Sequence, residues 1–290
     1  MASEIPLKRP DKVLWPADGF TKSDLLNYHR AAAPALLPHL KKRPLTVKRY
    51  PDGIDGEAFF QKNAPRGTPE WVPTITLPAE SAKRDVEYVL CNNWGTLAWL
   101  ANLASLEFHP WLSRVDRLER PDWLVMDIDP LEGGFELSVR AALVAREVLR
   151  EHGLEGCAKT SGGKGVHVYI PLQRRYDFGR VLDAGLRLSM LVEEQEPTLV
   201  TTQFKKGERD GKVFMDYTRN RPGQHVAAPF SPRARPGAPV SFPVAWSQLE
   251  RVHPLDFTIA TVPKLLERGD PWRKLCPAAQ TLPPDLSTTS

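Results

Sequence analysis

Residues 123–129 read WLVMDID, an apolar run that ends in two acids. Such a run indicates a buried central strand. Alternate residues on a strand point to the same face of a sheet, so Asp127 and Asp129 should lie side by side. The stretch therefore predicts a core strand that brings two carboxylates to one face.

A third acid extends this pattern. Two neighbouring carboxylates repel each other, a divalent cation relieves that repulsion, and hard oxygen ligands suit Mg²⁺ or Mn²⁺. The run VFMDYT at 213–218 puts Asp216 on another apolar strand, and acids from two strands fit a two-ion site for phosphoryl transfer. A structural reading stays open, because acids often end strands that reach solvent and Asp216 can pair with Arg219 or Arg221.

A glycine-rich turn, SGGKG at 161–165, lies between the predicted strands CAKT and VHVYIPL. Its glycines let backbone N–H groups approach a triphosphate closely. Ser161 adds a hydroxyl, Lys164 a positive charge and His167 a ring N–H. No Ser or Thr follows Lys164, so the turn is not a Walker P-loop. A plain glycine hairpin is the alternative.

Two further features suit nucleic acid. Phe59 and Phe60 are adjacent, so on a strand one can enter the core while the other stacks on a base; both in the core is the alternative. The loop SPRARPG at 231–237 is stiffened by prolines, and Arg233 and Arg235 suit phosphate capture. A solvated basic turn would look the same.

The remaining segments mix helical and extended patterns, which indicates an α/β or α+β class. The first helix is expected at about 22–33, capped by Thr21 or Ser23 and ended by Pro34 and Pro38. The other expected helices are 96–106, a helix from the cap Ser138 to Gly153, and 178–195; the expected strands are 45–50, 86–91, 123–129, 157–160, 166–172 and 213–218.

Composition sets the broad class. The 290 residues are 41% hydrophobic and 26% charged, which allows a large core in one domain or two joined lobes. The net charge of +4 is uneven. Positive charge concentrates in residues 1–50 and 205–235, which suits a polyanionic partner, although an ordinary solvated face would look the same. There is no long apolar run and no secretory signal, so we expect no membrane association and a cytoplasmic protein.

The three cysteines, Cys91, Cys157 and Cys276, are far apart in the sequence. No CxxC pattern or Cys/His cluster is present, which argues against zinc and against a disulfide framework. Buried free thiols are expected.

Six segments together resemble the successive motifs of the polymerase domain of bacterial DNA ligase D, a family of the archaeo-eukaryotic primase superfamily. The resemblance runs from DKVLWP at 11–16 to GDPW at 269–272. The segments are RYPDGIDGEAFFQK, EFHPWLSR, PDWLVMDIDP, KTSGGKGVHVYIPL, VFMDYTRN and APFSPRARPGAPVS.

The resemblance implies a primase-polymerase fold, with two mixed sheets and flanking helices around a catalytic groove, one sheet being like an RNA-recognition module. It implies a single catalytic domain over 1–290, with a basic part at 1–45 that carries a 5′-phosphate site. The composition of residues 280–290 predicts a flexible tail.

The resemblance also assigns residues. Asp127, Asp129 and Asp216 match the metal ligands, which are also the catalytic residues. The nucleotide-binding positions are Lys48, His109, Ser161, Gly162, Lys164, His167, Arg233 and Arg235. The DNA-binding positions are Lys12 and Lys22, which match the 5′-phosphate pair, Phe59 and Phe60 under the template, and Arg209.

The implied activity is DNA-directed nucleotide transfer onto 3′-hydroxyl ends, with two Mn²⁺ or Mg²⁺ ions and no zinc. Nucleoside and deoxynucleoside triphosphates are the substrates, with ribonucleotides preferred. The DNA partners are ends, gaps and overhangs with a 5′-phosphate in repair by non-homologous end joining, and Ku and a DNA ligase are further implied partners.

Three rival functions remain. A primase or lesion-tolerance primase-polymerase would use the same chemistry, but Lys12 and Lys22 favour gap filling. A DNA-end-bridging module with incidental catalysis does not require all three aspartates. A metal-dependent nuclease has no evident need for the turn that carries Lys164 and His167.

Overall fold

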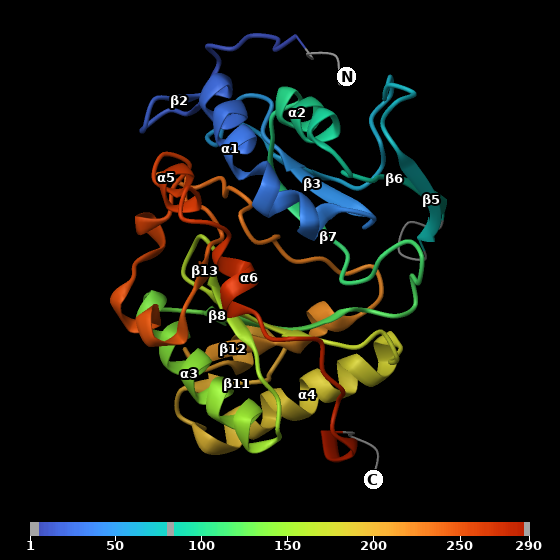
Figure 1. The fold of residues 1–290 in the computed structure, drawn as a ribbon. Helices are drawn as coiled ribbons and strands as arrows, with labels where there is room; N and C mark the ends of the chain where they lie inside the picture. The colour runs from blue at the N-terminus through green and yellow to red at the C-terminus, as the bar shows by residue number, and fades with distance from the viewer. Residues whose placement is uncertain (1–5, 80–83, 287–290) are drawn as a thin grey trace. The chain divides into compact units, whose positions relative to one another are not determined.

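A computed structural model describes residues 6–79 and 84–286 and divides the chain into two compact units (Figure 1). Unit 1 comprises Met1–Trp111, His225–Ser241 and Leu255–Asp270; unit 2 comprises Leu112–Gln224, Phe242–Pro254 and Pro271–Ser290. That residues 1–290 work as a single catalytic domain stays a prediction. Within the residues that the structure describes, no helix is both long enough and apolar enough to cross a bilayer.

Unit 1 is built on an antiparallel sheet. Its strands follow the order β4-β3-β6-β5, and β7 also pairs with β3. A separate hairpin joins β1 and β2. The strands are β1 (Val13–Trp15), β2 (Phe20–Thr21), β3 (Leu45–Arg49), β4 (Phe59–Gln61), β5 (Thr74–Ala79), β6 (Arg84–Val89) and β7 (Ser105–Pro110); the helices are α1 (Lys22–Leu40), α2 (Trp94–Asn102) and α5 (Val262–Leu266).

Helix α1 begins where the sequence predicts and ends later. Thr21 and Asp24 form a capping box, in which each side chain accepts the other's backbone N–H. The predicted stop at Pro34 and Pro38 is wrong, because α1 continues to Leu40. Both prolines lie on the exposed face of the helix, so the carbonyls that lose a donor face solvent while Leu40 on the other face is fully buried.

The predicted helix over 96–106 is also too long. Helix α2 ends at Asn102, and Ser105 already opens strand β7. Ala104 adopts a positive φ of 56° at the change of direction. The sequence could not show this boundary, because buried helices and buried strands share the same apolar composition.

Unit 2 contains a mixed sheet with β8 near its centre, as the run at 123–129 predicts. The strand order is β11-β12-β8-β10-β9-β13, with β11 and β12 parallel and the other neighbours antiparallel. The strands are β8 (Trp123–Pro130), β9 (Cys157–Thr160), β10 (Val166–Pro171), β11 (Val200–Thr201), β12 (Val213–Asp216) and β13 (Pro243–Val244).

Two long helices of unit 2, α3 (Phe135–Glu151) and α4 (Phe178–Gln195), contact β8 on one face of this sheet (Figure 1). Met126 and Ile128 point to that face and are at most 1% exposed. The alternate residues, including Asp127, therefore point to the opposite face. The remaining helical segments are α6 (Pro271–Leu275) and the 3-10 turns η2 (Lys206–Glu208), η3 (Tyr217–Asn220), η4 (Trp246–Arg251), η5 (Pro254–Asp256) and η6 (Pro284–Leu286).

Ser138 does not cap α3, contrary to the prediction. The N-cap is Gly134, and the side chain of Glu136 accepts its N–H at 3.1 Å. Ser138 is fully buried in the first turn. The predicted end at Gly153 is confirmed, with a left-handed φ of 66°.

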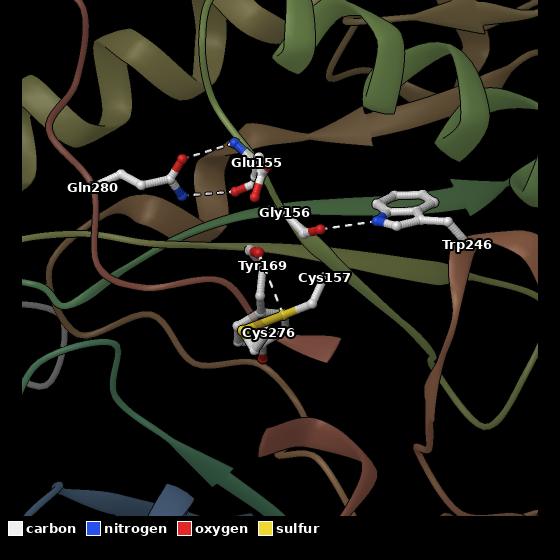
Figure 2. Close-up of a disulfide and its surroundings, with 7 residues drawn as sticks. All are labelled: Glu155, Gly156, Cys157, Tyr169, Trp246, Cys276 and Gln280. Carbon is white, nitrogen blue, oxygen red and sulfur yellow. Dashed lines mark hydrogen bonds between the residues drawn. A yellow bond between two sulfur atoms is a disulfide. The ribbon is translucent and has the colours of Figure 1, made fainter. Parts of the chain in front are cut away.

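The expectation of free thiols is wrong for two of the three cysteines. Cys157 on β9 forms a disulfide with Cys276, 119 residues along the chain (Figure 2). Cys91 is free and buried. Widely spaced cysteines give no pairing signal in a sequence, because only the fold brings them together.

The same region fixes part of the expected flexible tail. Gln280 exchanges two hydrogen bonds of 2.8 Å with the backbone of Glu155 (Figure 2), and Leu282 and Leu286 are buried. Arg180 donates to the carbonyls of Pro283 and Leu286. Residues 280–286 thus make defined contacts with the rest of unit 2, residues 287–290 lie outside the described residues, and the flexibility of 280–290 stays a prediction.

Candidate active site

A row of four facing residues crosses the sheet of unit 2. Asp216 on β12 lies opposite Asp127 on β8, Asp127 opposite His167 on β10, and His167 opposite Lys159 on β9. Directly opposite residues share a face of the sheet. The strand order therefore brings together two acids, an imidazole and an ammonium group that come from four separate strands.

Asp129 lies at the rim of this row. It follows Asp127 by two residues on β8, so it points to the same face, but it is exposed while Asp127 and Asp216 are 5% and 6% exposed. The structure thus places all three predicted aspartates on one face of one sheet.

Arg219 bridges the two buried aspartates. Its Nε lies 3.1 Å from Oδ2 of Asp127 and 3.0 Å from Oδ2 of Asp216. Thr218 donates its N–H and hydroxyl to Oδ1 of Asp216. The structural reading, in which Asp216 pairs with Arg219, is therefore correct as far as it goes, and the pairing includes Asp127.

The charges around Asp127 decide its ionisation. Burial by itself would raise the pKa of Asp127, but His167, Arg219 and Lys159 outweigh burial and hold that pKa well below its usual range. Burial would lower the pKa of Arg219, yet Asp127 and Asp216 raise it overall. Asp127 and Arg219 are therefore both ionised at neutral pH.

Lys159 is a site residue that sequence reasoning missed. It is fully buried, and its Nζ lies 2.8 Å from Nδ1 of His167. An ammonium group can only donate, so Nδ1 accepts and the ring proton belongs on Nε2, 3.0 Å from Oδ1 of Asp127. The only sequence signal was a lysine inside the apolar strand CAKT.

The glycine-rich turn lies against Asp129. Ser161 N donates to the carbonyl of Gly165 at 2.9 Å, and Gly165 N donates to Oγ of Ser161 at 3.1 Å. Gly162 has a φ of 75°, and Lys164 is exposed at the tip. A Cβ on Gly165 would collide with Oδ1 of Asp129 and with a β8 carbonyl, so the turn can approach the acids only with glycine there. The sequence alone did not distinguish Gly165 from the other glycines of the turn, because the atoms that exclude a side chain there belong to β8.

The acids fit a hard divalent cation, although they are not arranged as a ready-made site. Among residues 6–79 and 84–286, no group of three His, Cys, Asp or Glu side chains is arranged to hold a metal ion as it stands. Oδ1 of Asp127 is nevertheless buried, and its contact with Nε2 of His167 at 3.0 Å leaves it a further lone pair for a cation. A buried carboxylate oxygen with spare lone pairs, beside two more acids, suits Mg²⁺ or Mn²⁺.

Unit 1 holds a second polar cluster, on β3, β4 and β7. Lys48 lies opposite Phe60 on one side and opposite Glu107 on the other. Oε2 of Glu107 lies 3.0 Å from Nε2 of His109 and 3.3 Å from Nε of Arg233. The structure thus brings four predicted positions together around Glu107, a buried acid that sequence reasoning missed.

Glu107 is held ionised. Burial would raise its pKa, but the hydrogen bond from His109 and the charge of Arg233 outweigh burial and hold the pKa well below its usual range. The N–H of Ala234 also donates to Glu107, at 3.2 Å. A fixed carboxylate therefore orients both the histidine and the arginine loop, in which Arg235 is exposed.

Both phenylalanines of β4 lie outside the core. Phe59 is 43% exposed and Phe60 is 53% exposed, so both the all-core alternative and the expectation that one ring enters the core are wrong. Phe60 lies 5.5 Å, centroid to centroid, from the ring of His109, and Lys48 Nζ lies 5.3 Å from the Phe60 centroid. Phe59 instead faces the guanidinium of Arg49 at 5.4 Å.

The basic N-terminal part concentrates cations. Lys22 is buried, and its Nζ donates to the carbonyls of Lys8 and Asn102. Burial and then the charge of Lys12 lower the pKa of Lys22. Nζ of Lys12 lies 2.6 Å from Oδ1 of the exposed Asp52. Lys12 lies close enough to Lys22 to lower the pKa of Lys22, and two cations this close together suit an anion.

Arg209 lies in unit 2, near the acidic row. Its guanidinium stacks 3.6 Å from the ring centroid of Phe214 and donates to the carbonyls of Gln203 and Phe204. Phe214 is directly opposite Asp129. Arg209 is therefore held beside the strand that carries Asp216.

Comparisons with known proteins agree with this arrangement. A sequence model described as the LigD primase-polymerase domain matches residues 21–272. The multifunctional non-homologous end joining protein LigD of Mycolicibacterium smegmatis is 34% identical over 248 residues, covering 84% of this chain and 32% of that protein. The bifunctional LigD of Bacillus subtilis is 31% identical over 266 residues, covering 90% of this chain and 42% of that protein.

A solved structure extends the likeness to the fold. The polymerase domain of Mycobacterium tuberculosis ligase D, in complex with DNA, is 31% identical and superimposes with a TM-score of 0.85 over 94% of this chain and 99% of that one. The chain spans roughly a third to two fifths of the length of the curated relatives given above. The predicted primase-polymerase fold is thereby confirmed.

Proposed function

We propose that this chain, which belongs to the LigD primase-polymerase domain family, is a DNA-directed nucleotidyltransferase. It extends 3′-hydroxyl DNA ends and fills short gaps in non-homologous end joining. The observation that carries the proposal is the row Asp216–Asp127–His167–Lys159, with the turn at 161–165 against its rim. An acid-lined face beside a phosphate-binding turn is what nucleotide transfer requires.

The acids have the first role. Asp127, Asp129 and Asp216 would hold Mn²⁺ or Mg²⁺ ions, which supply Lewis-acid activation of the 3′-hydroxyl and neutralise charge on the triphosphate. No protein nucleophile is needed, so the remaining residues bind, orient and stabilise charge.

The turn and the histidine would bind the triphosphate. Lys164 is exposed and free to reach a phosphate oxygen. His167 would carry its ring proton on Nε2, because Lys159 occupies Nδ1, and that proton would turn from Oδ1 of Asp127 to a phosphate oxygen when the triphosphate binds. Ser161 accepts the N–H of Gly165 with its hydroxyl oxygen, which holds the turn in the shape that the triphosphate would meet.

The cluster of unit 1 would supply further positive charge and a stacking ring. Glu107 holds His109 and Arg233 in fixed orientations, and fixed donors stabilise developing charge without reorganising. Phe60 offers an exposed ring beside Lys48, a combination suited to stacking on a template base. Lys12 and Lys22 would take the 5′-phosphate beyond a gap.

Three finer points rest on family membership. Ribonucleotides would be preferred over deoxynucleotides. Ku and a DNA ligase would be partners at the break, and the protein would work on the nucleoid in the cytoplasm. DNA itself is the bound partner in the M. tuberculosis relative.

Primer extension on a duplex with a short gap tests the proposal. We expect nucleotide addition with Mn²⁺ or Mg²⁺, faster with ribonucleotides, and its loss in Asp127→Asn and Asp216→Asn while DNA binding persists. Addition that survives both substitutions would reject the assignment of the acids. Unprimed dinucleotide synthesis on single-stranded template would instead support a primase.

A further inference from the structure

We propose that Arg219 is the built-in counter-ion of the aspartate pair, and that a divalent cation binds only by displacing its guanidinium. The inference rests on the proposed function, because it concerns the same acids. It gives a role to Arg219, which the sequence suggested only as a possible ion-pair partner of Asp216.

The contacts place Arg219 where a cation belongs. Nε is 3.1 Å from Asp127 and 3.0 Å from Asp216, and in each case the contacted atom is Oδ2. The Asp127 and Asp216 side chains are 7% and 8% exposed. Two buried carboxylates directly opposite each other need a positive charge between them, and Arg219 supplies it.

The same oxygens cannot serve both partners at once. A divalent ion needs carboxylate lone pairs at close range, and both Oδ2 atoms are directed at Nε of Arg219. The two cations also repel each other. Binding of the ion and pairing with Arg219 therefore compete.

Arg219 is free to move while its backbone stays in place. Its side chain is 36% exposed, so the guanidinium has an open side toward solvent. The next residue, Asn220, is fully buried and exchanges two hydrogen bonds of 2.8 Å with the backbone of Val125. The η3 turn is thus anchored to β8, and displacement requires only a change of side-chain rotamer.

Mn²⁺ binding to the whole chain, without DNA or nucleotide, is the direct test. Arg219→Gln should bind Mn²⁺ roughly tenfold tighter than the wild type, because the competing charge is gone. Arg221→Gln is the matched control: it removes the same charge two residues away from an exposed position, and its affinity should match the wild type. Equal or weaker binding in Arg219→Gln overturns the proposal.

A second readout uses the unaltered protein, so it does not depend on the folding of a variant. A guanidine-directed dicarbonyl reagent, followed by mass spectrometry, should modify Arg219 faster when Mn²⁺ is present, while modification of Arg221 stays constant. Modification of Arg219 that is unchanged or slower in Mn²⁺ contradicts displacement.

One more variant separates this inference from the proposed function. If Asp127→Asn binds Mn²⁺ as the wild type does, the acids are not the metal ligands, and the proposed metal site and this inference both fall. If Asp127→Asn loses the ion but Arg219→Gln gains no affinity, only the role of Arg219 is rejected.

Discussion

Lys159 and His167 meet between neighbouring strands, with Nζ 2.8 Å from Nδ1, and Lys159 has no exposed surface. A buried ammonium beside one ring nitrogen selects the tautomer with its proton on the other. In this protein that proton is the one directed toward Asp127. Lys159 is therefore a positioning residue that acts through His167.

Lys159→Met should lower the rate constant of nucleotide addition by about 10- to 100-fold, in the range found for partners of site ligands. The ¹⁵N shifts of His167 should then report a mixture of tautomers in place of one. Lys206→Met, at an exposed position on η2, is the control and should change neither quantity. A slowed Lys159→Met enzyme with a single, unaltered His167 tautomer would contradict the positioning role.

His29 should make the protein sensitive to acid. It is fully buried, neither ring nitrogen has a hydrogen-bond partner among the described residues, and burial lowers its pKa to about 3. The unfolded chain takes up a proton below about pH 6.5 while the folded chain does not, so stability is lost as pH falls from 6.5 toward 3.

His29→Phe should remove this loss. Relative to the variant, the wild type should lose about 1.4 kcal/mol of unfolding free energy for each pH unit below 6.5. Urea unfolding at pH 7.5, 6 and 5 measures the difference. Parallel pH profiles for the two proteins would show that His29 is protonated in the folded state.

The disulfide should contribute about 2–4 kcal/mol of stability, because it closes a long loop in the unfolded chain. Cys276→Ser should lower the unfolding free energy by that amount and become insensitive to a dithiol reductant. Cys91→Ala, which leaves the bond between Cys157 and Cys276 intact, should keep the wild-type response to reductant. A reductant effect that persists in Cys276→Ser would locate the sensitivity elsewhere.

Phe60→Ala should weaken binding of single-stranded template by about 1–3 kcal/mol if a base stacks on its ring. Stability should change little, since the ring is 53% exposed. Phe59→Ala is the comparison, because that ring points to the other face of β4 and faces Arg49. Fluorescence titration with single-stranded template measures the affinity of both variants. An equal loss of affinity in the two would indicate a general effect on β4.

The ion pair with Asp52 should weaken the binding of a 5′-phosphate by Lys12. The two side chains lie 2.6 Å apart, and the hydrogen bond from Lys12 lowers the pKa of Asp52. Asp52→Asn should therefore increase the preference for gaps with a 5′-phosphate, whereas Lys12→Met should abolish it. Gap filling on matched substrates with and without the phosphate measures the preference. An unchanged preference in Lys12→Met would place the phosphate elsewhere.

The sequence predicts some of this fold from local pattern alone. Period-two alternation in β8 correctly puts Asp127 and Asp129 on one face, and the cap at Thr21 follows from side-chain chemistry. What local pattern cannot provide is strand order, so the meeting of Asp216 with Asp127 depended on the family resemblance. The burial of Lys159 and Glu107 was invisible for the same reason.

The wrong predictions share a cause as well. Pro34 and Pro38 do not end α1, because both lie on its exposed face while Leu36 and Leu40 on the other face are fully buried. Cys157 and Cys276 are brought together where Glu155, just before β9, is hydrogen-bonded to Gln280 of the C-terminal segment. Each error concerns a residue whose behaviour is set by neighbours distant in the chain.

Asn220 has a consequence for the pairing of β12 with β8. Its side-chain amide is hydrogen-bonded to both the backbone N–H and the carbonyl of Val125. If the ladder that pairs Asp216 with Asp127 continued, Thr218 would lie opposite Val125. A slip of one residue would turn Asp216 to the helix-covered face and would strip Val125 of both bonds. Asn220 takes no part in the proposed reaction. By fixing the register of β12 against β8, its side chain keeps the two carboxylates on the same side of the sheet.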